Sequence, residues 1–263
     1  MSDRSSEADE PVLINDPVAL AQKEAENALE QFDWGMEEVD RWLASRQRRL
    51  RVSLVLDLHR LALQDINRYA GNFRPAGVAI RGSSHKPVEQ AEVPQHVERM
   101  LQYVEDNWER RTAVHLAAYV LWQLNWIHPF SDGNGRTARI LSYMVLCAKV
   151  GMPLPGTNTI PEQISANKVP YYSALEKADE AFKAGKIDVT AMEGLLEDYL
   201  ANQLVDIHEK ATGQADRILD AASGSNDLIA PVKGSILQWV ENHPAITGLI
   251  GLIVVTVATI IFS

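Results

Sequence analysis

Nine consecutive residues, HPFSDGNGR from His128 to Arg136, carry side chains that could bind phosphate and move a proton. His128 titrates near neutral pH and is the candidate general base. Asp132 offers a hard oxygen ligand of the kind that Mg²⁺ prefers when it also holds substrate phosphates. Arg136 adds a planar cation suited to phosphate oxygens. These residue types, so close together, predict phosphoryl or nucleotidyl transfer.

The motif lies between two apolar segments with helical patterns. Residues 113–127 (AVHLAAYVLWQLNWI) are apolar on all sides, which is typical of a buried central helix. Pro129 should end this helix. Residues 136–150 predict a second helix that Gly151 caps. The motif is therefore expected to form a loop between two helices.

The glycines of the motif predict a backbone that binds an anion. Gly133, Asn134 and Gly135 come where the second helix begins, and the first N–H groups of a helix have no partner within it. Glycines on both sides of Asn134 let the backbone approach a phosphate closely. The alternative is an ordinary surface turn, in which His128 would only cap a helix.

The nine residues resemble the signature of the Fic family, His-Pro-Phe-x-(Asp/Glu)-Gly-Asn-Gly-Arg, at every fixed position. Arg139 matches that family's second arginine, and the resemblance extends over roughly residues 50 to 205. In Fic proteins the histidine deprotonates a target hydroxyl, the acidic residue holds Mg²⁺ on ATP, and AMP passes to the target with loss of pyrophosphate. The resemblance implies ATP and Mg²⁺ as cofactors, His128 as catalytic base and Asp132 as metal ligand. It implies nucleotide binding by Gly133, Asn134, Gly135, Arg136, Arg139, Tyr171 and Asp179.

The last two of these positions are expected at the adenine. In the family a tyrosine borders the adenine, and an asparagine follows about two helical turns later. Tyr171 matches the tyrosine, but Asp179 stands in place of the asparagine. An aspartate can accept a hydrogen bond from the adenine amino group but cannot donate one. The alternative for Tyr171 is a core tyrosine without a ligand.

Residues 69–88 change character, with glycines, prolines and an alternating run that predict a β-hairpin among the helices. The segment resembles the Fic flap, with Gly71, Arg74, Val78, Ile80, Gly82, His85 and Pro87 at the family's spacings. In the family the flap holds a target segment by strand addition. The resemblance therefore implies target binding by Val78, Ala79, Ile80 and Arg81. The alternative is an ordinary surface hairpin.

The amino-terminal part predicts a helical segment before the motif domain. Residues 1–16 lack periodicity and are expected to form a disordered arm. A helix of good formers is predicted over residues 18–32. A second helix is predicted over residues 37–63, with a candidate interruption around Ser45.

Part of the first helix resembles an inhibitory motif. Many Fic proteins are restrained by a helix with the pattern (Ser/Thr)-x-x-x-Glu-(Gly/Asn), whose glutamate pairs with the second active-site arginine. Glu26 and Asn27 fit the end of this pattern, but Gln22 stands where Ser or Thr is expected. The resemblance implies that Glu26 pairs with Arg139 and hinders ATP binding. The alternative is a solvated helix face.

The carboxyl-terminal part predicts a linker and a membrane anchor. Residues 245–262 contain no charged side chain. At 1.5 Å per residue they reach roughly 27 Å, enough to span the hydrocarbon core of a bilayer. A core helix is the alternative. The expected organisation is a disordered arm (1–16), an amino-terminal helical segment (17–49), an all-α Fic domain with a hairpin flap (50–220), a linker (221–244) and a transmembrane helix (245–262).

Composition limits the class of protein. The chain of 263 residues has 46% hydrophobic residues, which is normal for a globular protein. Its net charge of −10 argues against nucleic acid as a partner. The single cysteine, Cys147, lies in an apolar helix pattern and is expected in the core.

The resemblance implies a protein adenylyltransferase that transfers AMP from ATP to a hydroxyl side chain of a target protein. With the predicted anchor, the enzyme is expected on a membrane with the Fic domain in the cytosol, where ATP is plentiful. A Fic-type phosphotransferase is one alternative, although that branch usually has lysine at the position of Gly135. A catalytically silent membrane adaptor is the other, disfavoured because every catalytic position is retained.

Overall fold

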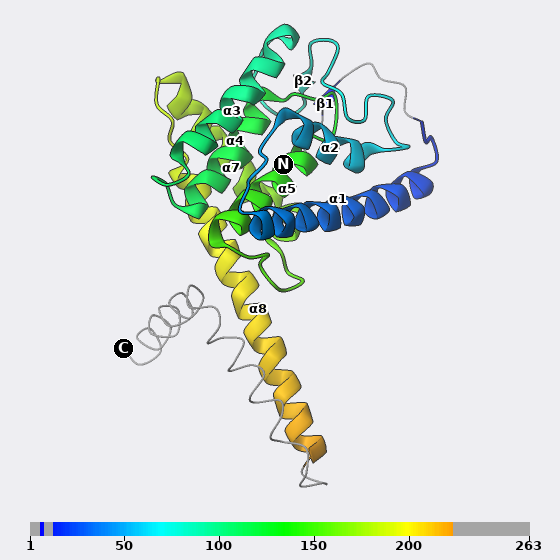
Figure 1. Cartoon of the computed structure of the whole chain (residues 1–263). Coiled ribbons are helices and arrows are strands. Elements are labelled where there is room, and N and C mark those ends of the chain that lie inside the picture. Colours follow the sequence, from blue (N-terminus) through cyan, green and yellow to red (C-terminus); the bar gives the residue numbers. More distant parts are fainter. Residues whose placement is uncertain (1–5, 8–12, 223–263) are drawn as a thin grey trace. The chain divides into compact units, whose positions relative to one another are not determined.

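The computed structural model describes residues 6–7 and 13–222, and the side chains of residues 13–206 (Figure 1). The chain divides into a unit of residues 1–204, which contains the motif, and a unit that starts at Val205. The helices are α1 (Pro17–Ser45), α2 (Val52–Leu63), α3 (Val93–Asn107), α4 (Ala113–Ile127), α5 (Asn134–Val150), α6 (Ile160–Ala166), α7 (Lys168–Lys183) and α8 (Thr190–Ala222). The described strands are β1 (Ser6–Glu7) and β2 (Ala79–Ile80), and a 3-10 turn, η1, covers Gln90–Glu92. The prediction of a mostly helical domain is confirmed.

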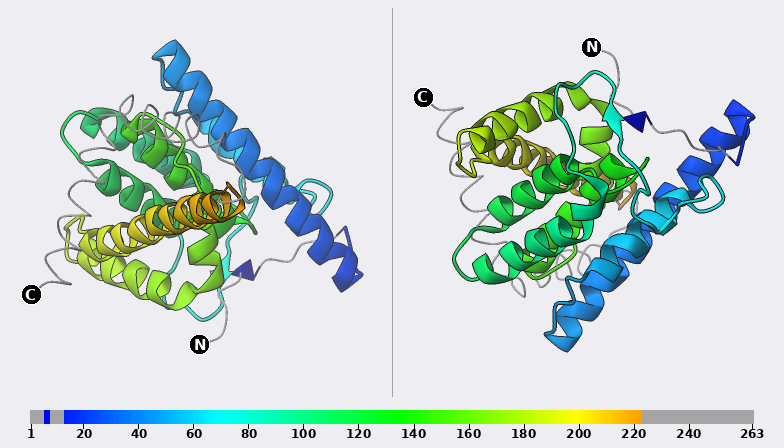
Figure 2. Two further views of the ribbon diagram at one scale, coloured as in Figure 1. Left: turned by 90° about the horizontal axis from the view of Figure 1, so that it is seen from below. Right: turned by 90° about the horizontal axis from the view of Figure 1, so that it is seen from above.

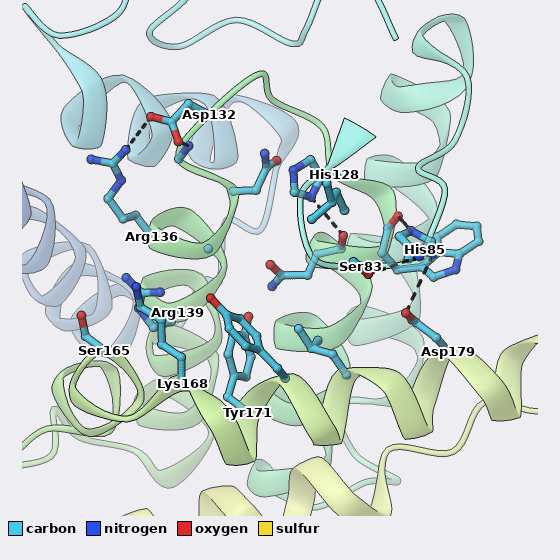
Figure 3. Close-up of a pocket in the computed structure, with 18 of the residues that line it drawn as sticks. Ser83, His85, His128, Asp132, Arg136, Arg139, Ser165, Lys168, Tyr171 and Asp179 are labelled. Atoms are coloured by element: carbon cyan, nitrogen blue, oxygen red, sulfur yellow. Dashed lines mark hydrogen bonds and ion pairs between the residues drawn. The ribbon is translucent and has the colours of Figure 1, made fainter. Parts of the chain in front are cut away.

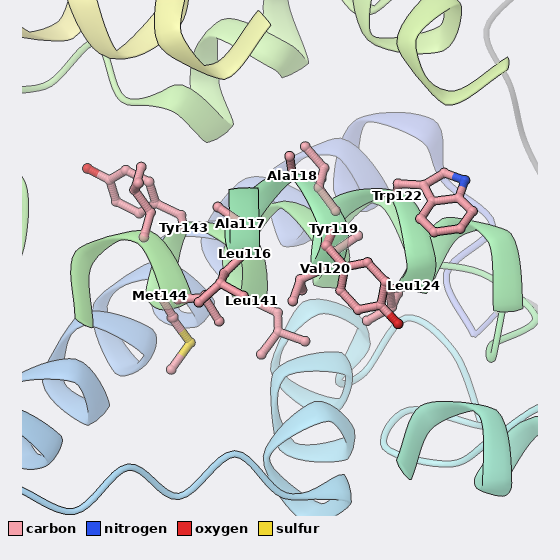
Figure 4. Packing of buried hydrophobic residues seen from close by; sticks show 14 of the residues in the cluster. Leu116, Ala117, Ala118, Tyr119, Val120, Trp122, Leu124, Leu141, Tyr143 and Met144 are labelled. Carbon is pink, nitrogen blue, oxygen red and sulfur yellow. The ribbon is translucent and has the colours of Figure 1, made fainter. Parts of the chain in front are cut away.

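Helix α4 is the centre of the motif-bearing unit and has the predicted bounds. Thr112 caps its amino terminus by accepting a hydrogen bond from the backbone N–H of His115. Leu116, Trp122 and Leu124 are completely buried in α4, which packs along α5 (Figure 4). Burial of each such side chain contributes about 2 kcal/mol. The ends of α4 and α5, and thus the loop between them, are held by this core.

The remaining helices surround this pair. α1 and α2 pack against α5, whereas α3 and α7 contact α4 (Figure 2). Cys147 of α5 is fully buried, and burial raises the pKa of its thiol to about 12. The prediction that this cysteine belongs to the core is confirmed.

Helix α1 is continuous, so the predicted boundary between residues 32 and 37 is wrong. Gly35 lies in that stretch, where α1 meets α5. A Cβ on Gly35 would lie 3.1 Å from Cγ2 of Ile140 and 3.3 Å from Sδ of Met144. The glycine therefore allows two helices to approach closely and does not end one. The predicted interruption around Ser45 is confirmed, because α1 ends there and α2 begins at Val52.

The predicted hairpin of residues 69–88 is also wrong. The segment contains one short strand, β2, and its partner strand comes from elsewhere in the chain. β2 pairs antiparallel with β1, with Ser6 opposite Ile80 and Glu7 opposite Ala79. The expectation of disorder is thus wrong for residues 6–7, because their backbone finds hydrogen-bonding partners about 70 residues away.

Beyond α5 the sequence predicts a helix over residues 161–184 with a break near Pro170, and a last core helix from residue 188 to about residue 220. Both helical regions are present with shifted boundaries. The break predicted near Pro170 lies at Asn167, between α6 and α7. Pro170 sits in the first turn of α7, where the N–H that it lacks has no intrahelical partner. The last predicted helix is confirmed as α8.

Within residues 6–7 and 13–222, no helix combines the length and the apolar character that crossing a membrane requires. The predicted transmembrane helix, residues 245–262, lies outside the described residues. So does the predicted linker, except for its first two residues, which belong to the end of α8.

Candidate active site

A cavity of about 430 Å³ opens beside the motif loop (Figure 3). This volume is in the range of small-molecule sites. Ten residues that the sequence analysis assigned to the site line it: Ile80, His128, Asp132, Gly133, Asn134, Gly135, Arg136, Arg139, Tyr171 and Asp179. The fold therefore brings the predicted catalytic, metal and nucleotide residues together.

The side chain of Asn134 stabilises the conformation of the motif loop. This side chain is 3% exposed, accepts a hydrogen bond from the N–H of Phe130 (2.9 Å) and donates one to the carbonyl of Phe130 (2.7 Å). These bonds engage the amide on both sides, so the group that Asn134 offers to a ligand is its backbone N–H at the start of α5. Gly133 precedes it with φ +73°, and a Cβ there would lie 2.9 Å from Cδ1 of Leu63. Only glycine fits this position without strain.

His128 ends α4 in the left-handed conformation (φ 52°, ψ 59°). The ring is buried, and its Nδ1 lies 3.4 Å from the carbonyl of Asn125. This contact favours the tautomer with the proton on Nδ1 and makes Nε2 the acceptor. Burial lowers the pKa of His128 from 6.5 to about 4, and the hydrogen bond to Asn125 opposes that shift. The imidazole is therefore neutral at pH 7 and can accept a proton.

Arg74 fixes the flap, residues 69–88, to the motif loop. Its buried guanidinium donates to the carbonyls of His128 (2.9 Å), Ala76 (2.9 Å) and Val88. Its backbone N–H donates to the carbonyl of Pro129 (2.9 Å). Arg74 belongs to the predicted flap pattern, and these four hydrogen bonds explain why an arginine is suited to this position.

His59 of α2 is a site residue that the sequence analysis missed. Its Nδ1 accepts from the N–H of Gly71 (3.0 Å), and its Nε2 donates to the carbonyl of Asp132 (3.1 Å). The ring stacks on Phe130, with centroids 3.6 Å apart. Burial lowers the pKa of His59 to about 4. His59 thus joins α2, the flap and the motif loop, and a histidine within the apolar face of a predicted helix was the signal available.

Two carboxylates contact the motif arginine. Arg136 donates to Oδ2 of Asp132 (2.7 Å) and to Oε1 of Glu24 (2.9 Å). The arginine side chain is 21% exposed, and that of Glu24 is 44% exposed. Helix α1 therefore places a carboxylate in the cavity next to the proposed phosphate ligand.

The glutamate that contacts an active-site arginine is Glu24, whereas the sequence predicted Glu26 for this role. Glu26 accepts a hydrogen bond from Gln22 within α1 (3.0 Å), and Asn27 is buried and donates to the carbonyl of Gln64 (2.9 Å). The predicted pairing of Glu26 with Arg139 is thus replaced by a pairing of Glu24 with Arg136. Residues two positions apart on a helix point in different directions.

Asp179 lines the cavity but already has partners. Nε1 of Trp122 donates to its Oδ1 (2.8 Å), and its Oδ2 lies 3.8 Å from Nδ1 of His85. His85 also contacts the carbonyl of Trp126 through Nε2 (2.7 Å). Asp179 therefore holds a flap histidine against α4, and its contact with a nucleotide stays a prediction. Tyr171 is 3% exposed and lines the cavity beside it.

Eight further residues line the cavity without having been predicted to bind the nucleotide: Glu24, Ser83, Asn125, Trp126, Ser165, Lys168, Tyr172 and Leu175. Lys168 is of interest because it adds a cation to a cavity that already contains two arginines. It precedes Tyr171 by three residues, so helical spacing places both on one face of α7. Of the predicted target-binding residues, Ile80 lines the cavity and Ala79 is exposed.

The protein groups at this site are suited to a metal ion that is bound mainly by the phosphates of a nucleotide. Within the described part of the chain, no group of three or more His, Cys, Asp or Glu side chains could hold a metal ion. Asp132 presents one half-exposed carboxylate to the cavity. Mg²⁺ is commonly held by one or two carboxylates together with phosphates and water. Asp132 is therefore a suitable single protein ligand for Mg²⁺ on a nucleotide.

The fold and the loop define a helical domain that presents an anion-binding loop and a neutral histidine between two core helices. Residues 49–146 match the model of the Fic/DOC family. These residues of the chain therefore form a Fic/DOC family domain.

Known relatives support this assignment. The chain is 32% identical over 143 residues to a protein adenylyltransferase Fic of Drosophila persimilis, covering 52% of this chain and 26% of the relative. It is 35% identical over 94 residues to a Fido domain-containing protein of Dictyostelium discoideum, covering 33% of this chain and 61% of the relative. The chain thus spans about a quarter of the Drosophila protein.

A solved structure shows the same fold. A Fic domain-containing signaling protein from Bacteroides thetaiotaomicron superposes with a TM-score of 0.59 at 20% identity. The superposition covers 72% of this chain and 74% of the other. The helical arrangement around the motif is therefore a Fic fold.

Proposed function

We propose that this protein is an adenylyltransferase that transfers AMP from ATP to a hydroxyl side chain of a target protein. The observation that best supports this proposal is that the buried, neutral His128 shares one cavity with two arginines and the amino terminus of α5. The chain's similarity to proteins named protein adenylyltransferase Fic supports the same reaction.

Each group of residues in the cavity has a separate role in this proposed reaction. The backbone N–H groups at the start of α5 and the guanidinium of Arg136 would bind phosphates. His128 takes the proton from the target hydroxyl, whose oxygen then attacks the α-phosphorus, and the bond to the β-phosphate breaks to release pyrophosphate. Asp132 would hold Mg²⁺, which neutralises phosphate charge when bound.

The phosphotransferase alternative differs at position 135, where that branch usually has lysine and this chain has Gly135. A Cβ at Gly135 would lie 3.3 Å from Nη1 of Arg139. The lysine usual in that branch would therefore require only a small shift of the end of the Arg139 side chain. Mass spectrometry of a protein target incubated with ATP and this chain tests the proposal. Addition of AMP is expected; addition of phosphate would favour the alternative, and no modification would favour the silent adaptor.

The contact of Glu24 with Arg136 leads to a prediction about nucleotide affinity. Glu24→Gln should strengthen Mg-ATP binding several-fold, because the arginine loses one of two carboxylates that compete with phosphate. Ion pairs this exposed contribute up to about 1 kcal/mol. Calorimetric titration measures the effect.

A matched control for this prediction lies two residues away. Glu26→Gln removes the same charge from the same helix, yet Glu26 contacts Gln22 rather than a motif arginine. It should leave the affinity for Mg-ATP nearly unchanged. Equal strengthening by both variants would mean that only net charge matters, and would contradict a specific restraint by Glu24.

We further propose that residues 245–262 anchor the enzyme to a membrane with the Fic domain in the cytosol. The uncharged sequence of this segment supports the proposal. Deleting residues 245–263 should move the protein from the membrane fraction to the supernatant without lowering its transfer rate. Continued sedimentation with membranes after the deletion would contradict the anchor.

A further inference from the structure

The edge of β2 is occupied by the chain's own amino-terminal segment. β1 pairs antiparallel with β2 across two residues on each strand. Figures 1 and 2 show β1 beside β2. In an antiparallel pair of this length, one residue pair exchanges backbone hydrogen bonds and the next does not. The contact between the two strands is therefore small.

This edge lies at the candidate active site. Ile80 of β2 lines the cavity, and the N–H of Ser83 donates to the carbonyl of Ile80 (3.2 Å) in the turn that follows. Ser83 and His85, the next residues of the flap to line the cavity, come from this turn and from just beyond it. A strand that docks on β2 therefore runs beside the cavity that contains His128.

The sequences of the two partners are complementary in charge. β2 is followed by Arg81 and Lys86, both in the flap. Residues 1–11 (MSDRSSEADEP) carry four acidic side chains and one basic side chain. An acidic segment is thus favoured at this edge over a basic one.

We propose that β1 competes, within the same chain, with an acidic, extended segment of a partner protein for the edge of β2. While β1 is paired with β2, the partner segment cannot bind there. The identity of that partner as the AMP acceptor rests on the proposed function. A short strand is suited to this role because each backbone hydrogen bond contributes only about 1 kcal/mol. A partner segment that pairs over more residues displaces it.

Hydrogen exchange tests the occupancy without any catalysis. In a chain that lacks residues 1–11, the β2 amides should exchange about fivefold faster than in the full chain, as expected for loss of about 1 kcal/mol. The substitutions Ser6→Pro and Glu7→Pro, made together in the full chain, should have the same effect, because proline has no N–H to donate. Amides of α4 and α5 serve as the internal control. Unchanged exchange at β2 in both variants would overturn the proposal.

Peptides test the chemistry of the occupant. A synthetic peptide with the sequence of residues 1–11 should restore protection of β2 when added to the truncated chain. A matched peptide with proline at positions 6 and 7 should not, and one with its four acidic residues replaced by amides should bind more weakly. Equal protection by all three peptides would overturn strand docking and the charge preference together.

Transfer assays separate this proposal from the proposed function. Truncation should raise AMP transfer to an acidic acceptor peptide that binds β2 in the exchange experiment, and leave Mg-ATP affinity unchanged. If β2 loses protection as expected while neither form transfers AMP to any acceptor, strand docking is supported and the proposed reaction is the part that fails.

Discussion

Replacing His128 by alanine is expected to lower the rate of AMP transfer by about 10² to 10⁴, the usual effect of removing a general base. Mg-ATP binding should stay largely intact, because the imidazole acts on the acceptor hydroxyl and not on the phosphates. The backbone groups of His128 that contact Leu124 and Arg74 are present in any variant. Incorporation of label from ATP measures the rate, and calorimetry measures binding.

The backbone conformation of His128 determines the best control. Its φ of 52° lies in the left-handed region, where asparagine is tolerated better than alanine. His128→Asn should therefore preserve the loop while removing the titrating base, and should be as inactive as the alanine variant. Near-normal transfer by either variant would contradict the role of His128. Recovery of activity in the asparagine variant alone would assign the alanine defect to the loop.

The free energy of unfolding should fall by several kcal/mol between pH 7 and pH 4. Burial holds the pKa values of His59 and His128 at about 4 in the folded protein, against 6.5 for an ordinary histidine. In that window the unfolded chain binds protons that the folded chain does not, so stability rises with pH. A shift of this size corresponds to at most about 3 kcal/mol for each histidine. Typical domains are stable by only about 5 to 15 kcal/mol, so the effect is large.

Urea unfolding at pH 7, 5.5 and 4 measures this dependence. Carboxylates also titrate near the lower end of the range, so the informative quantity is the difference between the parent and a variant without one histidine. His59→Gln and His128→Asn should each flatten the slope between pH 6.5 and pH 4, whatever they do to stability at pH 7. A slope equal to the parent's in both variants would show that neither histidine is held neutral.

The local features of the motif could be predicted from the sequence. The bounds of α4, the loop after it and the cap at Gly151 follow from apolar pattern, proline and glycine, which act within a few residues. The assignment of His128, Asp132 and Arg136 to one site needed no tertiary information, because they share a nine-residue loop. The resemblance to a family then identified more distant residues of the cavity.

The partners of the site residues were decided by the tertiary structure. Arg136 pairs with Glu24, which is 112 positions away, and Asp179 accepts from Trp122, which is 57 positions away. A pattern read along the chain gives the face of one helix, but which carboxylate reaches an arginine depends on how α1 crosses α5. Gly35 permits that crossing, and the same glycine misleads an analysis of local helix propensity.

The same limit applies to the flap. Alternation in residues 78–81 predicted an extended segment, and β2 is extended. Its partner could not be predicted, because the backbone N–H and C=O groups are the same in every residue except proline and carry no sequence signal. Two strands pair when the fold brings them together, and here it brings residues 6–7 to β2, whose Ile80 lines the cavity.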